Sequence, residues 1–426
     1  MDKRKLFFWC LYTFANSIVF VNFLVYFAKW MVVDSGVSDM AYNMIFVIAA
    51  VMLLFSAPAL AAHTDACGNR KLFLNLATVG TVGAYLVAGL CAIYGAPVLY
   101  AFLARMAGHY FFQLSYIFYD PMLNDLSDEK HRARASGIGQ FCSNAGMIFG
   151  LAVFLPLVAS GGRLAPLIPS VALFALLALP MMIFYHEKPC RAEPVKKQKI
   201  KLGFDWKKFR KFILTSAAAP ILIAFFFYTN ALNTITNNYA IYANKVLSMS
   251  DGLTSVILMV NLAAAALGAL VIGFIGDKIG IRRCLIGILW TWLVLIPVIA
   301  AADSTGVFFA LAAVLGLTIG AGWAISRAYV STNLEQGQIG YGFSFYTIFE
   351  RFSSTIGPLA WGGILLFGGG YRTAMLSMAG FIVVGLIVLQ FFTKPETRQV
   401  YKMQGGRKVS SSVVYKPSPK ARLKRK

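Results

Sequence analysis

Long apolar runs are the feature that most restricts how this chain can fold. They recur along nearly all of its 426 residues, and each covers about 20 residues, the length that an α-helix needs to cross a bilayer. Hydrophobic residues make up 58% of the chain and charged residues only 13%, whereas a soluble protein carries about 25% charged residues. The chain is therefore predicted to be an all-α integral membrane protein.

Twelve transmembrane helices are predicted from these runs, in two pseudo-symmetric six-helix bundles. They cover approximately residues 6–32, 41–62, 72–94, 98–120, 135–160, 164–185, 212–240, 252–276, 284–302, 307–331, 342–368 and 372–393. The predicted domains are an N-terminal bundle (1–185), a basic cytoplasmic linker (186–211), a C-terminal bundle (212–393) and a basic cytoplasmic tail (394–426). The tail is rich in Lys, Ser and Pro and is expected to be disordered.

Basic residues collect on one side of this predicted topology. Most of the 39 Lys and Arg lie before the first span, in the loops that follow even-numbered spans, in the linker or in the tail. Because cytoplasmic loops carry such an excess, both termini are predicted to be cytoplasmic. The net charge of +22 is then a signature of topology, and no nucleic-acid binding is expected. The linker and tail are expected to attract anionic lipid headgroups, with on the order of 1 kcal/mol for each Lys or Arg.

One loop pattern occurs in both halves, each time between the second and third span of a bundle. Asp65, Gly68 and Arg70 in the first half match Asp277, Gly280 and Arg282 in the second. Glycine permits a tight turn between antiparallel helices, and an aspartate can accept hydrogen bonds from a neighbouring helix N-terminus or an arginine. A duplicated bundle with matching loops is typical of a two-halved transporter, and we expect these six residues to govern its conformation.

Several segments together resemble the major facilitator superfamily, whose signature loop lies between helices 2 and 3 and recurs between helices 8 and 9. A closer resemblance is to its vacuole-effluxer-like, autophagy-related branch. The matching segments are Trp9–Ser17, Phe118–Leu123, Ala135–Gly139, Gly322–Arg327, and Gly342 with Phe343 through Gly357 with Pro358. The chain departs from the family pattern at His63 and Thr64, before the first signature aspartate, and at Glu350, where a small residue is commoner.

The resemblance implies a transporter that works by alternating access, with helices 1, 4, 7 and 10 around a central cavity. It also implies export, with an amino acid or a related metabolite as one candidate solute. The sequence itself leaves open the solute, the direction and the choice between secondary active and facilitative transport.

Polar residues in the fourth predicted span form a single stripe. Arg105, His109, Gln113, Tyr116 and Asp120 follow each other at intervals of three or four residues, so they share one helical face. Such groups are costly in hydrocarbon, from about 2.5 kcal/mol upward for a charge, and each therefore suggests a functional site. The alternative is a structural ladder bonded to a neighbouring helix.

Amide side chains extend the predicted substrate site to two further spans. Asn230, Asn233 and Asn237 recur at helical spacing in the seventh span, and Asn16 lies in the first. Amides donate and accept without carrying charge, which suits recognition of a polar solute. The predicted substrate-binding residues are Asn16, Arg105, His109, Gln113, Asn230, Asn233 and Asn237. Any single Asn can instead serve as an interhelical hydrogen-bonding group.

Charged residues in the last three spans complete the predicted machinery. Arg327, Glu350 and Arg351 are assigned to gating, and a pair between Glu350 and Arg327 is expected because pairing lowers the cost of burying both charges. If protons are co-transported, the candidate carriers are His109, Asp120 and Glu350. An unperturbed histidine has a pKa of about 6.5, so His109 could change its charge within the physiological pH range.

Other functional classes fit the sequence less well. The four His and six Cys are dispersed and show no metal-ligand or nucleophile spacing, and no phosphate-cradling loop occurs, so we expect no enzyme, metal or cofactor. A non-transporting receptor or scaffold built on a transporter fold is the remaining alternative, supported by the basic tail alone. The expected partner is a small solute, with protons as a second, and we expect a monomer.

Overall fold

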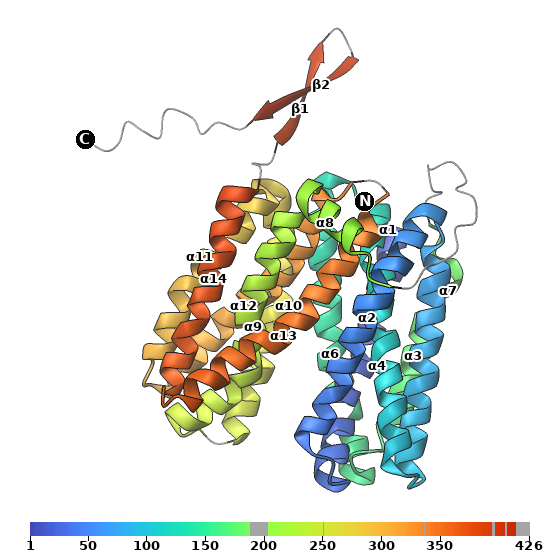
Figure 1. The fold of residues 1–426 in the computed structure, drawn as a ribbon, viewed down its shortest axis with the longest axis vertical. Coiled ribbons are helices and arrows are strands. Elements are labelled where there is room, and N and C mark those ends of the chain that lie inside the picture. Colours follow the sequence, from blue (N-terminus) through green and yellow to red (C-terminus); the bar gives the residue numbers. More distant parts are fainter. Residues whose placement is uncertain (188–202, 250, 336, 394–396, 405–406, 415–426) are drawn as a thin grey trace.

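The computed structural model describes residues 1–187, 203–249, 251–335, 337–393, 397–404 and 407–414. Its helices run roughly along one direction and form two groups, α1 to α7 and α9 to α14 (Figure 1).

Six long helices form the first half of the chain. They are α1 (Lys3–Asn22), which continues into the wider turns η1 (Phe23–Phe27) and η2 (Trp30–Asp34), α2 (Asp39–Cys67), α3 (Arg70–Ile93), α4 (Val98–Tyr119), α6 (Arg132–Gly161) and α7 (Leu167–Phe184). Short segments join α4 to α6: η3 (Asp120–Met122), α5 (Leu123–Leu126) and η4 (Glu129–His131). Local chemistry sets the helix ends: Asp2 and Ser38 accept hydrogen bonds from the first turns of α1 and α2.

The second half repeats the arrangement. A short helix, α8 (Trp206–Thr215), precedes α9 (Ala219–Leu247), α10 (Asp251–Ile279), α11 (Ile281–Ala301), α12 (Thr305–Asn333), α13 (Ile339–Leu366) and α14 (Tyr371–Phe392). The fold class predicted from the sequence is confirmed. Within the described residues, 10 helices are long and apolar enough to cross a membrane; α4 and α13 have the length but more polar residues.

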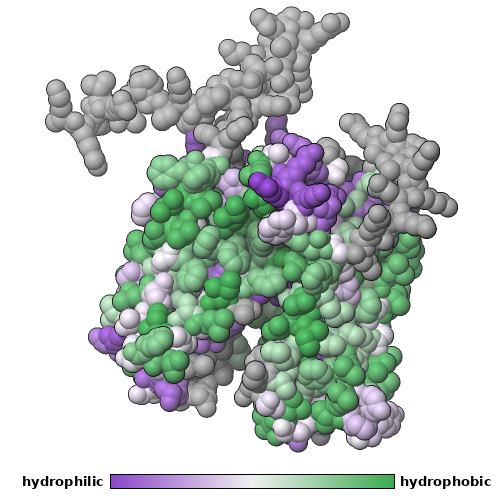
Figure 2. All heavy atoms as spheres, in the orientation of Figure 1, coloured by the Kyte–Doolittle hydropathy of each residue, from purple (hydrophilic) through white to green (hydrophobic). Residues whose placement is uncertain are grey.

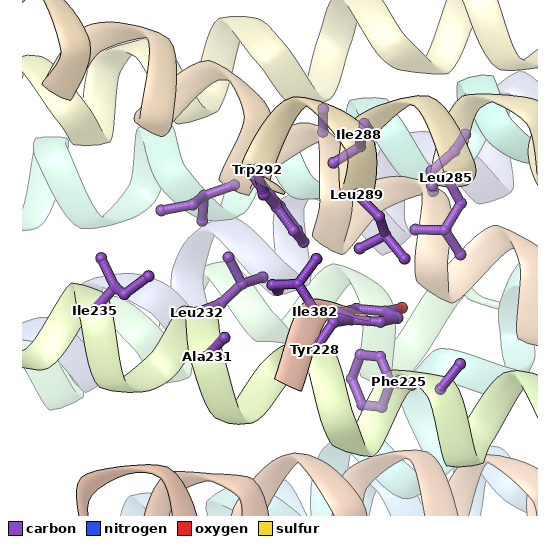
Figure 3. Close-up of a cluster of buried hydrophobic side chains, with 14 of the residues drawn as sticks. Phe225, Tyr228, Ala231, Leu232, Ile235, Leu285, Ile288, Leu289, Trp292 and Ile382 are labelled. Carbon is purple, nitrogen blue, oxygen red and sulfur yellow. The ribbon is translucent and has the colours of Figure 1, made fainter. Parts of the chain in front are cut away.

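Each half encloses its own apolar core. In the second half, Tyr228 of α9 packs among Trp292 of α11 and Ile382 of α14, and Figure 3 shows these side chains filling the space between the helices. The first half has an equivalent core around Trp9, Tyr85 and Phe118. Close packing of large side chains makes each half a rigid unit, so relative movement of the halves is the cheaper deformation.

Contacts between the halves are very close at α6 and α10. A Cβ added to Gly137 would lie 2.4 Å from the carbonyl oxygen of Ala269, and one on Gly273 would lie 2.9 Å from that of Ala133. The end of the molecule at which α1 begins and α8 lies is called the closed end here; Figure 2 shows the halves separated by a cleft at the opposite, open end.

The tail differs from the sequence expectation of disorder. β1 (Thr397–Gln404) pairs antiparallel with β2 (Arg407–Val414), beyond the closed end (Figure 1). Val and Tyr favour strands, and pairing of the two segments gives them regular structure. Most of the basic linker, at 188–202, lies outside the described residues.

Candidate functional site

The aspartates of the repeated loops join the two halves at the closed end. Asp65, at the end of α2, accepts hydrogen bonds from the backbone N–H groups of Gly340 and Tyr341, both at 2.9 Å. Both residues lie in the first turn of α13, so a carboxylate of the N-terminal half caps a helix of the C-terminal half. Arg70 holds the same carboxylate at 2.5 Å, and Asp65 is only 5% exposed.

The second copy of the loop makes the reciprocal contact. Asp277, near the end of α10, accepts a hydrogen bond from the backbone N–H of Arg134 at 3.2 Å, in the first turn of α6. The guanidinium of Arg134 lies 3.4 Å from the same carboxylate. The sequence predicted hydrogen bonds to helix ends; the structure adds that each aspartate reaches across to the other half.

The remaining loop residues shape each half internally. Gly68 ends α2 with a left-handed φ of 66°, and Gly280 separates α10 from α11 with a φ of 101°. Arg282 donates to the carbonyl of Leu389 at 3.0 Å, at the C-terminal end of α14, as Lys71 donates to that of Ile183 at the end of α7. Cations at these ends complement the partial negative charge of the last carbonyls.

The N-terminus of α3 has a cap that sequence reasoning missed. Glu187, just beyond α7, accepts hydrogen bonds from the backbone N–H groups of Arg70 (3.1 Å) and Lys71. Burial raises the pKa of the Glu187 carboxyl above its ordinary value, although the hydrogen bond from Lys71 favours the charged form. Its position in a basic linker gave no local signal of this long-range contact.

An ion pair between the halves lies deeper in the molecule. Arg327 of α12 lies 3.2 Å from Asp120, at the end of α4, and donates to Gln140 of α6 at 3.2 Å. The expected pair between Arg327 and Glu350 is wrong, because Glu350 pairs with its neighbour Arg351 at 2.7 Å. Arg327 instead pairs with Asp120 of the other half. The spacing of residues along one helix could not reveal which half supplies the carboxylate.

Two aromatic residues of the predicted motifs support this ion pair. The indole N–H of Trp9 donates to the carbonyl of Tyr119 at 3.2 Å, and the Tyr119 hydroxyl donates to the carbonyl of Trp9 at 2.9 Å. Their rings stack with centroids 4.6 Å apart, and the Arg327 guanidinium lies 6.0 Å from the Trp9 ring. The stack fixes α1 against α4 directly beside the charge pair.

The polar stripe of α4 is buried, with unsatisfied groups. Arg105, His109 and Gln113 are 0%, 2% and 1% exposed. The amide nitrogen of Gln113 lies 3.3 Å from Nε2 of His109, and Arg105 donates to the Tyr85 hydroxyl at 3.1 Å. Within the described part of the chain, Nε and Nη2 of Arg105, Nδ1 of His109 and Oε1 of Gln113 have no hydrogen-bond partner. Buried polar atoms are nearly always paired, so this row has capacity for a further ligand.

The structure does not bring all the predicted amides into one site. Asn230 joins α9 to α13: its amide oxygen accepts a hydrogen bond from the N–H of Gly357 at 2.8 Å. Its amide nitrogen donates to a carbonyl within α9, so both groups already have partners. Asn233 donates to two serine hydroxyls of α13, and Asn237 is exposed. Asn16 is 1% exposed, and neither of its amide atoms has a partner among the described residues.

Two groups of buried or partly buried polar residues therefore remain as candidates: the α4 stripe with Asn16, and the charged residues Asp120, Arg327, Glu350 and Arg351. No group of three His, Cys, Asp or Glu side chains that could hold a metal ion occurs within the described ranges. Two bundles joined by mirrored caps at one end, and separated at the other, suggest a solute path between them.

Comparison with known proteins decides the family. The model of the Major Facilitator Superfamily matches residues 9–265 and 221–420. The chain belongs to the major facilitator superfamily. As a major facilitator it is a multi-pass membrane transporter and not an enzyme. It is 25% identical over 420 residues to the "Uncharacterized MFS-type transporter YxiO" of Bacillus subtilis (strain 168), a match covering 93% of this chain and 96% of that protein.

Solved major facilitators share this fold at low sequence identity. The human organic anion transporter MFSD10 (TETRAN) matches with a TM-score of 0.74 at 14% identity, over 91% of this chain and 99% of that chain. The E. coli fucose:proton symporter FucP matches with a TM-score of 0.75 at 14% identity, over 91% and 98%. These likenesses establish the architecture and leave the solute open.

Proposed function

We propose that this major facilitator carries a small polar or anionic solute through the cleft between its halves, by alternating access. The observation that carries the proposal is the buried Arg105, a permanent cation whose Nε and Nη2 have no hydrogen-bond partner within the described residues. A guanidinium offers a planar fork of donors suited to a carboxylate or phosphate. The human organic anion transporter with the same fold is consistent with this choice of solute.

We place the closed end on the cytoplasmic side. The basic residues of the signature loops, the linker and the tail support this, because cytoplasmic segments carry the excess of Lys and Arg. The cleft then opens away from the cytoplasm, so in this conformation the solute exchanges with the opposite side of the membrane. Export is favoured because the helix 1 segment Trp9–Ser17 resembles the vacuole-effluxer-like branch.

The mirrored caps would form the inner gate. To open the closed end, α13 must leave Asp65 and α6 must leave Asp277, and each lost cap costs about 0.5–2 kcal/mol. Each cap joins an aspartate of one half to a helix of the other half. Separation of the halves at the closed end therefore breaks both caps in the same movement. The Asp120–Arg327 pair also spans the halves and would separate with them.

Proton coupling, if present, would use Asp120, Glu350 or His109. Asp120 and Glu350 each face an arginine, so arrival of an anionic solute at Arg327 or Arg351 would release a carboxylate for protonation. The fucose:proton symporter shows that this architecture supports such coupling in another chain. Substrate-dependent proton uptake in proteoliposomes would support it, and absence of such uptake would reject proton coupling.

The test begins with a screen of small anions and polar metabolites for thermal stabilisation of the purified protein. Any hit is then titrated against Arg105→Gln, with Arg163→Gln as the matched control, because Arg163 is an exposed open-end arginine bonded to Asp34. We expect at least a tenfold loss of affinity, about 1.4 kcal/mol, in Arg105→Gln alone. An affinity within about twofold of wild type would reject Arg105 as the anion contact.

A further inference from the structure

The short helix α8 has the composition of a helix that lies on a membrane surface. Its sequence, Trp206–Thr215, alternates four basic residues with aromatic and aliphatic ones, and Asp205 caps it through the Lys208 N–H at 3.0 Å. Trp206 and Leu214 are 66% and 73% exposed, whereas Phe212 is buried. Exposed apolar side chains beside Lys and Arg are typical of helices held in the headgroup layer.

Aromatic packing fixes α8 on the start of α13. The ring of Phe212 lies 5.3 Å from that of Tyr341 and 5.8 Å from that of Phe345, and Phe209 packs on Phe345 at 4.8 Å. The N–H of Gly203, just before α8, donates to the carbonyl of Phe55 in α2 at 3.1 Å. The helix is thus attached to both halves.

A cavity of about 210 Å³ lies between α8, α13 and α2. Its walls include Lys208, Lys211 and Thr215 of α8, Gln338 and Tyr341 at the start of α13, and Ala62 of α2. The ammonium of Lys208 lies 4.5 Å from the Tyr341 ring centroid, so the aromatic face holds one cation in place. Two cations and an amide around one small cavity match the donors that a phosphate group needs.

We propose that this cavity binds the phosphate of an anionic phospholipid headgroup. A lipid is favoured over a soluble phosphate because α8 also exposes Trp206 and Leu214, apolar side chains that would lie among acyl chains and glycerol groups. Figure 2 shows hydrophilic surface over α8 directly above the apolar flank of the bundle, which is the level at which headgroups lie.

Occupation of the cavity would stabilise the closed end. Tyr341 lines the cavity and also donates its backbone N–H to Asp65 in the cap that joins the halves. Ala62 belongs to α2 and Tyr341 to α13, so a bound headgroup touches both halves, and the site would be lost when the two helices separate. Anionic lipid would then favour the conformation described here over one open at the closed end.

The experiment compares two double variants that remove the same charge from the same helix. Lys208→Gln with Lys211→Gln removes the cavity cations, and Lys207→Gln with Arg210→Gln removes exposed cations that do not line it. Short-chain phosphatidylglycerol is titrated into each purified full-length protein in neutral detergent, with phosphatidylcholine as the reference lipid, and binding is followed by thermal stabilisation. We expect about a 30-fold loss of phosphatidylglycerol affinity in the cavity variant, at on the order of 1 kcal/mol per Lys, and less than about threefold in the control.

Several outcomes would overturn the proposal. Equal losses in both double variants would mean that diffuse surface charge, and not the cavity, attracts the lipid. Inorganic phosphate or glycerol phosphate stabilising the protein as strongly as phosphatidylglycerol at the same concentration would assign the cavity to a soluble ligand. A third variant, Lys208→Arg with Lys211→Arg, should keep the charge and the binding; loss there, in a protein with unchanged helical content, would also contradict the assignment.

Discussion

Removal of the Asp65 carboxylate tests the gate at the closed end. Asp65→Ala deletes two backbone hydrogen bonds of 2.9 Å to α13 and leaves Arg70, 2.5 Å away, without its partner there. A hydrogen bond to a charged group contributes about 1.5–3 kcal/mol, but water replaces part of it at an opened helix end, so we take about 2 kcal/mol as the net loss. That is a factor of about 30 in the conformational equilibrium.

Spin labels on Glu129→Cys and Glu335→Cys report this equilibrium, because both residues are exposed and lie on opposite halves at the closed end. If about 1% of wild-type molecules are open at this end, about a quarter should be open in Asp65→Ala, visible as a second, longer distance. Asp303→Ala, which removes an exposed open-end carboxylate paired with Arg372, is the control and should change nothing there. A single unchanged distance in Asp65→Ala would refute the reasoning.

Three further substitutions separate the parts of the account. Asp120→Asn leaves Arg327 buried without its countercharge and should cost about 3–5 kcal/mol of unfolding free energy, partly recovered in the double variant with Arg327→Gln, as thermal denaturation would show. In Gly137→Leu the added Cβ would lie 2.4 Å from the carbonyl oxygen of Ala269 in α10. The two helices must then move apart, so crosslinking between α6 and α10 should fall. Asn230→Ala should lower the free energy of unfolding by about 1–3 kcal/mol without altering solute affinity in a binding titration, because the Asn230 amide oxygen is already hydrogen-bonded to α13.

The helices were predictable because their cause is local. Apolar runs of membrane-spanning length, interrupted at Gly68 and Gly280, define the spans and the turns between them. The polar stripe of α4 was predictable for the same reason, since helical periodicity alone places its members on one face. Even α8 carries a local pattern, Trp206–Thr215, although the predicted boundaries divide that stretch between the basic linker, ending at 211, and the seventh span, beginning at 212.

Pairings between distant residues were not predictable from one sequence. Nothing near Asp65 indicates that its hydrogen-bond donors lie at Gly340 and Tyr341, in the other half of the chain. The same holds for Arg327, whose partner is Asp120 and not Glu350, which is closer to Arg327 along the sequence. These contacts depend on how two rigid bundles meet, which is a property of the whole fold and not of any one helix.

Alternating access is the central claim, and distances at both ends of one molecule test it most directly. The closed-end pair at Glu129 and Glu335 is compared with an open-end pair at Asp34 and Asp303, in wild type and in Asp65→Ala with Asp277→Ala. The account predicts opposite changes: the closed-end distance lengthens in the double variant while the open-end distance shortens. An open-end distance that stays constant or lengthens as the closed end opens would contradict it.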